Sequence, residues 1–211
     1  RIKWQTEDLV NEGNLSVKTL EGISQIKESA LELISLSNLL LSSGRMEQEN
    51  YKYTYKNIPL AKIVDKVMLS FKTYINSKHI NFSIDVGLNV PDVYVDEEKL
   101  ASAVHVLVEN AVLYVGANGI VHLQISVEND TVRFSITDNG IGIPAKDQAN
   151  IFTGFYRGGV ARTIDTEGVG LGLSMAKSII EHQGGSIGVS SAGEGKGSTF
   201  WFTLLGHKEQ M

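Results

Sequence analysis

The sequence contains no cysteine. This absence excludes a disulfide framework, a thiol nucleophile and a thiolate zinc site, and it is consistent with a reducing compartment. An excess of basic residues is also lacking, because 19 Lys and Arg stand against 24 Asp and Glu, for a formal net charge of −5. Without a basic stripe along the chain, we expect no nucleic-acid partner.

Long apolar runs are missing as well. No stretch approaches eighteen consecutive apolar residues and no signal-peptide pattern opens the chain, so we expect no membrane-spanning helix within it. With 211 residues, the chain can form one good core with a smaller appendage. Because it begins at Arg1 rather than at a methionine, we expect a piece of a longer protein. Such a protein can carry sensory or transmembrane segments upstream of this piece.

Glycine is scarce in the first part of the chain and abundant in the last part. Only three of the 21 glycines precede Gly87, whereas 14 lie between Gly140 and Gly197. This distribution predicts a helical N-terminal part and a C-terminal part that is built around tight backbone turns.

Residues 17–46 carry apolar side chains three and four positions apart. This spacing predicts one long amphipathic helix. Its wide apolar stripe favours a helical bundle, completed by a dimer partner or by a missing helix, and an ordinary core helix is the alternative. The polar residues 42–53 that follow are typical of a hinge.

The rest of the chain mixes helical and strand patterns. Apolar spacing predicts helices at residues 60–75, 97–114 and 172–183. Alternation predicts strands at residues 81–86, 91–95, 121–127, 132–137, 186–190 and 198–204, with a hairpin turn at Asn129-Asp130. This order predicts an α+β fold: a two-layer α/β sandwich with a mixed, mostly antiparallel sheet covered on one face by helices, preceded by the long N-terminal helix.

Two glycine clusters are candidate sites. The stretch DNGIGIP, residues 138–144, follows a predicted strand and is explained either by a turn or by a ligand that approaches the backbone beside Asp138. The stretch EGVGLGLS begins at Glu167 and opens a helix, although its GxGxG spacing matches no dinucleotide fingerprint. Unpaired backbone N–H groups at a helix start bind anions, which favours a phosphate site over a purely structural turn.

Polar residues inside apolar elements are a further signal. Asn110 lies within the apolar helix predicted at residues 97–114, where an unpaired amide would be costly. Its side chain either bonds a neighbouring backbone group or offers a hard oxygen ligand to Mg²⁺. The five histidines are scattered and form no metal or catalytic spacing, so we expect structural roles for them.

Taken in order, these segments resemble the catalytic, ATP-binding domain of sensor histidine kinases, whose superfamily includes gyrase, heat-shock chaperone and mismatch-repair ATPases. ENAVLY is similar to the family's N box, DNGIGIP to its first glycine box and IFTGFYRG to its F box. GVGLGLS resembles the second glycine box, and GEGKGSTFWF resembles the last glycine-rich strand motif. The resemblance covers essentially the whole chain, and five motifs in this order and spacing are highly specific.

The resemblance implies roles for the matched residues. Asp138 would accept a hydrogen bond from the exocyclic amine of adenine, and Asn110 would be the ligand of a Mg²⁺ ion that bridges the phosphates. Arg157 would lie near the γ-phosphate, and residues 145–168 would form a mobile lid over the ATP. The other residues placed in the nucleotide site by resemblance are Tyr114, Gly140, Gly142, Ile143, Phe152, Phe155, Gly168, Gly170, Leu171, Gly172, Leu173 and Thr199. Among them, Gly140 and Gly142 would let the nucleotide lie against the backbone.

The resemblance also divides the chain. Residues 1–50 are similar to part of the family's dimerisation and phosphoacceptor hairpin, without the helix that bears the histidine, and residues 51–211 are similar to the catalytic domain. Two positions depart from the N box. Leu113 replaces a lysine that contacts phosphate in many relatives, so Arg157, Arg162 or Lys177 would have to compensate. Val106 replaces the glutamate that activates water in hydrolysing relatives.

The implied function is the ATP-binding catalytic part of a two-component sensor histidine kinase. With ATP and Mg²⁺ as cofactors, it would transfer the γ-phosphoryl group to a histidine on the hairpin of the same protein or of its dimer partner. A response-regulator receiver domain would then take the phosphoryl group. The implied location is cytoplasmic, with a homodimeric parent whose anchoring in the inner or plasma membrane stays open. The alternatives are a degenerate nucleotide-sensing module without kinase activity and, disfavoured by Val106, a hydrolysing ATPase of the gyrase type.

Overall fold

The computed structural model describes residues 53–164 and 168–207. The long helix expected at residues 17–46 and the expected hairpin segment therefore lie outside the described residues. None of the helices within the described ranges is long and apolar enough to cross a bilayer.

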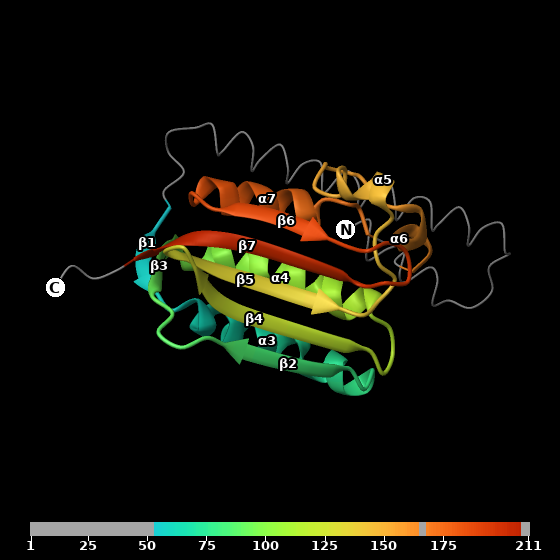
Figure 1. The fold of residues 1–211 in the computed structure, drawn as a ribbon, viewed down its shortest axis with the longest axis horizontal. Coiled ribbons are helices and arrows are strands. Elements are labelled where there is room, and N and C mark those ends of the chain that lie inside the picture. Colours follow the sequence, from blue (N-terminus) through green and yellow to red (C-terminus); the bar gives the residue numbers. More distant parts are fainter. Residues whose placement is uncertain (1–52, 165–167, 208–211) are drawn as a thin grey trace, which may run out of the picture. The chain divides into compact units, whose positions relative to one another are not determined.

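A seven-stranded sheet forms one layer of the fold (Figure 1). Its strands are β1 (Tyr55–Ile58), β2 (Asn81–Val86), β3 (Asp92–Asp96), β4 (Ile120–Glu128), β5 (Thr131–Asp138), β6 (Ser186–Ser190) and β7 (Ser198–His207). The order along the sheet is β1-β3-β7-β5-β4-β2, and β6 pairs with β7. Only β2 and β4 run parallel among these described strands, so the prediction of a mixed, mostly antiparallel sheet is confirmed.

Helices cover one face of this sheet and leave the other face open (Figure 1). The long ones are α3 (Leu60–Ser77), α4 (Glu97–Tyr114) and α7 (Gly172–His182), and α4 contacts both of the others. The buried positions of α3 recur every three or four residues from Leu60 to Ile75, which is the stripe that predicted the helix. The predicted α/β sandwich is therefore confirmed.

The central strands show why alternating residues formed this sheet. Every second residue from Val121 to Ile125 and from Val132 to Ile136 is buried. Phe134 and its cross-strand partner Phe202 are fully buried and stack with their ring centroids 4.7 Å apart. The predicted hairpin turn is also confirmed: Asn129 and Asp130, with φ of 48° and 66°, join β4 to β5 in a two-residue loop.

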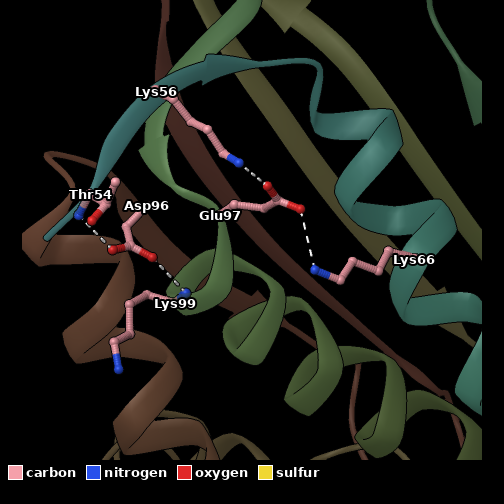
Figure 2. A network of polar contacts seen from close by, with 6 residues as sticks. All are labelled: Thr54, Lys56, Lys66, Asp96, Glu97 and Lys99. Atoms are coloured by element: carbon pink, nitrogen blue, oxygen red, sulfur yellow. Dashed lines mark hydrogen bonds and ion pairs between the residues drawn. The ribbon is translucent and has the colours of Figure 1, made fainter.

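Strand β1 lies between the hinge expected at residues 42–53 and the helix expected at residues 60–75, where the sequence analysis predicted no element. β1 pairs antiparallel with β3, and polar contacts join it to the start of α4 (Figure 2). The Asp96 carboxylate caps α4 by accepting from the backbone N–H of Lys99 at 3.1 Å, and it also accepts from the backbone N–H of Thr54 at 2.9 Å. A polar stretch of sequence does not reveal that its residues make such tertiary contacts.

Glu97 provides a second connection at the same place (Figure 2). Its carboxylate pairs with Lys56 of β1 and, at 3.3 Å, with Lys66 of α3. Hydrogen bonds from the two lysines, Lys56 first, lower the pKa of Glu97. The first strand is thus joined to the helix that carries Asn110.

The sequence analysis predicted no helix between β5 and α7, in the stretch that includes the expected lid at residues 145–168. Two short helices interrupt it, α5 (Ala145–Gln148) and α6 (Gly159–Ile164). Their residues have no extended apolar stripe, because a helix of one or two turns is too short to display one.

Candidate functional site

Asn110 lies in the second half of α4 and is partly buried. Its side-chain amide donates a hydrogen bond of 2.7 Å to the backbone carbonyl of Val106, one helical turn earlier. Both alternatives from the sequence are therefore compatible, because this bond uses the amide nitrogen and not the carbonyl oxygen of the same side chain. An amide oxygen of this kind is a suitable ligand for Mg²⁺.

Asp138 is the last residue of β5, and only 6% of its surface is exposed. One carboxylate oxygen accepts from the backbone N–H of Gly140 at 2.8 Å, and the other accepts from the hydroxyl of Ser198 at 2.6 Å. Burial raises the pKa of Asp138, and these hydrogen bonds oppose the rise without cancelling it. The site therefore contains a nearly buried acidic group that is held in one orientation.

Ser198 was missed by the sequence analysis, which assigned Thr199 to the site. Because successive strand residues face opposite sides of a sheet, only one of the two can reach Asp138. Ser198 does so, whereas the Thr199 hydroxyl bonds to the hydroxyl of Thr137 at 2.9 Å. The pairing of Asp138 with Ser198 across β5 and β7 is a register that the sequence does not reveal.

Gly140 and Gly142 follow Asp138, and contacts within the protein explain why both positions are glycine. A Cβ atom at Gly140 would collide with the backbone carbonyl of Tyr114, the last residue of α4. Gly142 has φ of 66°, and a Cβ there would collide with the carbonyl of Gly193. The first glycine cluster is thus packed tightly between α4 and the β6–β7 loop, and its proximity to a nucleotide stays a prediction.

Helix α7 begins directly after the second glycine cluster. Leu171 is its N-cap, and the first backbone N–H groups of the helix, at Gly172 and Leu173, have no intrahelical acceptor. Gly172 lies against α4, because a Cβ on it would stand 3.2 Å from a methyl group of Val106. The start of α7 therefore lies next to the turn of α4 that holds Asn110. Its phosphate contacts and the Mg²⁺ contact of Asn110 stay predictions, and the two predicted sites are neighbours in the fold.

The lid candidates lie between these clusters. Phe152 packs edge-on against Phe200 with centroids 6.4 Å apart. Phe155 has φ of 65°, which is rare for an aromatic residue, and its backbone N–H donates to the carbonyl of Gly170 at 2.9 Å. Gly170 also has a positive φ of 78° and lies close to Phe155 and Arg157. The F-box segment is therefore attached to the loop that precedes α7.

Two of the three basic residues that could compensate for the missing lysine at position 113, Arg157 and Lys177, have other partners in the structure. Arg157 donates to the carbonyl of Ala161 at 3.4 Å, and Lys177 is 3.7 Å from Glu181, one turn along α7. Gly168 is adjacent to residues 165–167, which lie outside the described residues, and its assignment stays a prediction, as does that of Arg162. Among residues 53–164 and 168–207, no three His, Asp or Glu side chains are grouped to hold a metal.

A cavity of about 390 Å³ borders Asp138. It is lined by Thr137, Asp138, Gln148, Ser190, Ser191, Ala192, Lys196, Gly197, Ser198 and Thr199. Neither Asn110 nor any residue of α7 contributes to this lining. The cavity thus approaches the carboxylate from the side of the β6–β7 loop.

Comparison with known proteins places this geometry in a family context. Residues 95–207, more than half of the chain, match the family model described as histidine kinase-, DNA gyrase B- and HSP90-like ATPase. The sensor histidine kinase WalK of Bacillus subtilis is 33% identical over 184 residues, which are 84% of this chain. The chain spans only 29% of the length of that curated relative.

Solved structures show the same fold. The nucleotide-free catalytic domain of the histidine kinase ThkA is 26% identical, with a TM-score of 0.64 over 72% of this chain and 96% of that domain. Full-length ShkA, solved in complex with AMPPNP, is 25% identical, with a TM-score of 0.70 over 96% of this chain and 42% of its own. That protein binds an ATP analogue.

Proposed function

Because the chain belongs to the family of histidine kinase-, DNA gyrase B- and HSP90-like ATPases, we propose that it is the ATP-binding catalytic part of a two-component sensor histidine kinase. The reaction is transfer of the ATP γ-phosphoryl group to a histidine of a dimerisation hairpin. The bond between the γ-phosphorus and the bridging oxygen breaks, a phosphorus–nitrogen bond forms, and ADP leaves. The names of the sensor kinase WalK and of the other matched kinases support this assignment.

The observation that carries the proposal is the buried, oriented carboxylate of Asp138. A carboxylate whose pKa is raised by burial still accepts hydrogen bonds when it is ionised, and an N–H donor bonds to it more strongly than to a neutral acceptor. The exocyclic amine of adenine is such a donor. The Gly140 N–H and the Ser198 hydroxyl fix the direction in which the carboxylate accepts.

Phosphoryl transfer of this kind depends mainly on positioning and on neutralisation of charge. The backbone at the start of α7, at Gly172 and Leu173, holds the phosphates, and Asn110 presents its side-chain oxygen toward them. Mg²⁺, when bound at Asn110, neutralises phosphate charge. Arg157 takes part after leaving the Ala161 carbonyl, which is a weak partner at 3.4 Å.

Two side chains that depart from the family pattern affect the reaction in different ways. Val106 packs on Gly172 and carries no group that could activate water, so hydrolysis is slow. Leu113 carries no charge for the phosphates, so we expect affinity or rate to be modest.

The wider assignments are part of the same proposal. Residues 1–50 are a partial dimerisation and phosphoacceptor segment, and residues 51–211 are the catalytic domain. The parent protein is a homodimer whose catalytic domain lies in the cytoplasm, with or without a membrane anchor elsewhere, and it passes the phosphoryl group to a response-regulator receiver domain. No nucleic acid takes part.

The test is to mix the 211-residue chain with a separate hairpin dimer that bears a phosphoacceptor histidine and to follow γ-labelled phosphate with Mg²⁺. We expect acid-labile, base-stable label on the hairpin, no label on the chain itself, and very little free phosphate. A hairpin with the histidine replaced by alanine is the control for the acceptor, and Asn110→Ala is the control for the site. Nucleotide binding without transfer would indicate a sensing module, and rapid release of free phosphate would indicate a hydrolase.

A further inference from the structure

The segment that follows Asp138 is held against the loop between β6 and β7. The Gly140 carbonyl accepts from the backbone N–H of Gly197 at 3.1 Å, and the Ile141 carbonyl accepts from that of Gly195 at 2.6 Å. Gly142 follows with a positive φ and lies against the carbonyl of Gly193. Beyond that point, side chains have to hold the segment.

Ser191, immediately after β6, is the first of these side chains. Its hydroxyl oxygen accepts from the backbone N–H of Ile143 at 2.9 Å and from that of Gly193 at 3.2 Å. The same hydroxyl donates to the carbonyl of Gly197 at 2.6 Å. One side chain therefore connects Ile143 to both ends of the β6–β7 loop.

Gln148, the last residue of α5, is the second. Its amide nitrogen donates to the carbonyl of Ile143 at 3.0 Å and to the carbonyl of Ser191 at 2.9 Å. The two protons of the amide thus satisfy two carbonyl oxygens that can only accept. A methionine, which has nearly the same shape, would leave both without this donor.

We propose that Gln148 and Ser191 are positioning residues for adenine recognition, which they control by fixing the backbone of Ile143 against the β6–β7 loop. This inference rests on the proposed function. The two ends of the fixed segment are the two groups that orient Asp138, because Gly140 donates to one of its carboxylate oxygens and Ser198, next to Gly197, donates to the other. A shift of Ile143 along the loop moves these donors and hence the direction of the carboxylate.

The same contacts define where a lid can begin. Gln148 attaches α5 to the loop, so the first four residues of the predicted lid, 145–148, move with the adenine site. Among the described lid residues, those from 149 to 164 are then left to open and close.

The test compares ATP with inosine triphosphate, which has a carbonyl where adenine has its amine. Calorimetric titration of the 211-residue chain with Mg²⁺ should show that the unchanged protein prefers ATP. In Gln148→Met and Ser191→Ala, we expect ATP to bind roughly tenfold more weakly while inosine triphosphate changes little, so that the preference shrinks. Gln148→Glu should weaken ATP binding more than Gln148→Met does, because the glutamate places an acceptor against two carbonyl oxygens.

Matched controls separate positioning from general damage. Gln124→Met and Ser186→Ala make the same chemical changes at exposed positions of the sheet, away from the cavity beside Asp138, and should leave both affinities unchanged. Ser191→Thr should restore the preference for ATP. Hydrogen exchange of the Ile143 amide should accelerate in Gln148→Met even where binding is too weak to titrate.

Several results would overturn the inference. An unchanged preference for ATP in Gln148→Met and Ser191→Ala would do so, and so would an equal loss of both nucleotides, which would mean a purely structural role. Failure of the unchanged protein to bind ATP would instead refute the proposed function, and this inference with it.

Discussion

Replacing Asp138 by asparagine should weaken ATP binding. It should also make the folded protein more stable, relative to the unchanged protein, as the pH rises. Asparagine keeps the shape of the side chain and removes its charge. The carboxylate is buried, and its two oxygens accept from Gly140 and Ser198 at 2.8 and 2.6 Å. Because the adenine amine would donate to a charged acceptor, its hydrogen bond contributes about 1.5–3 kcal/mol, so ATP should bind roughly tenfold to a hundredfold more weakly in Asp138→Asn.

The stability effect follows from the raised pKa of Asp138 in the folded protein. A raised pKa means that the folded state holds this proton more tightly than the unfolded chain, where an aspartate titrates near about 3.9. The contribution of Asp138 to stability is therefore complete below that value and is lost as the pH rises through the folded-state pKa. Asparagine does not titrate. As the pH rises from the unfolded-state pKa through the folded-state pKa of Asp138, the free energy of unfolding of the unchanged protein should therefore fall relative to that of Asp138→Asn.

Calorimetric titration with ATP and Mg²⁺ at neutral pH measures the first effect. Urea unfolding without nucleotide at several pH values from about 3.5 to 8 measures the second. Asp85→Asn, on the exposed strand β2, is the matched control and should leave ATP affinity unchanged. Unchanged ATP affinity in a folded Asp138→Asn variant would refute the adenine contact. A stability difference that moves the other way with pH would refute the effect of burial on this carboxyl.

Three further predictions concern the supports of the site. Asp96→Ala removes the α4 cap and the hydrogen bond to Thr54, so it should lower the free energy of unfolding, measured by urea denaturation, by about 1–3 kcal/mol. Lys66→Met, which removes only an exposed ion pair, should lower it by less than about 1 kcal/mol. Gly142→Ala, which combines a positive φ with a collision, should lower the melting temperature more than Gly116→Ala, whose Cβ would meet nothing within 4 Å; equal losses would contradict the packing argument. Hydrogen exchange in residues 149–164 should slow when ATP and Mg²⁺ are added, and equal protection would count against a lid.

Much of the fold followed from local patterns. The helices α3, α4 and α7 lie where apolar residues recur at helical spacing, and the hairpin turn at Asn129-Asp130 lies between two alternating stretches. These features depend on residues close together in the chain, so periodicity and turn chemistry are sufficient to predict them. β1 was not predicted, because its four residues have a single buried member and its partner is almost forty residues away.

The candidate site was predicted less completely than the fold. Asp138, Asn110 and the glycine clusters were marked by residue types that are unusual within a strand or helix. Ser198 was missed because serine and threonine stand side by side, and strand register decides which of the two faces the carboxylate. Gln148 gave no signal, because a glutamine in a polar stretch is ordinary until its carbonyl partners are known.

The sequence by itself determined the family resemblance, the longer helices and most strands, and the identity of the acidic and amide groups at the site. Only the tertiary structure decided how these groups are held. The parallel pairing of β2 with β4, the contact of Ser198 with Asp138, and the fit of Gly140 under the Tyr114 carbonyl all join residues far apart in the chain. The reason is that local preference is set by neighbours in sequence, whereas register, burial and hydrogen-bond partners are set by packing across the whole domain.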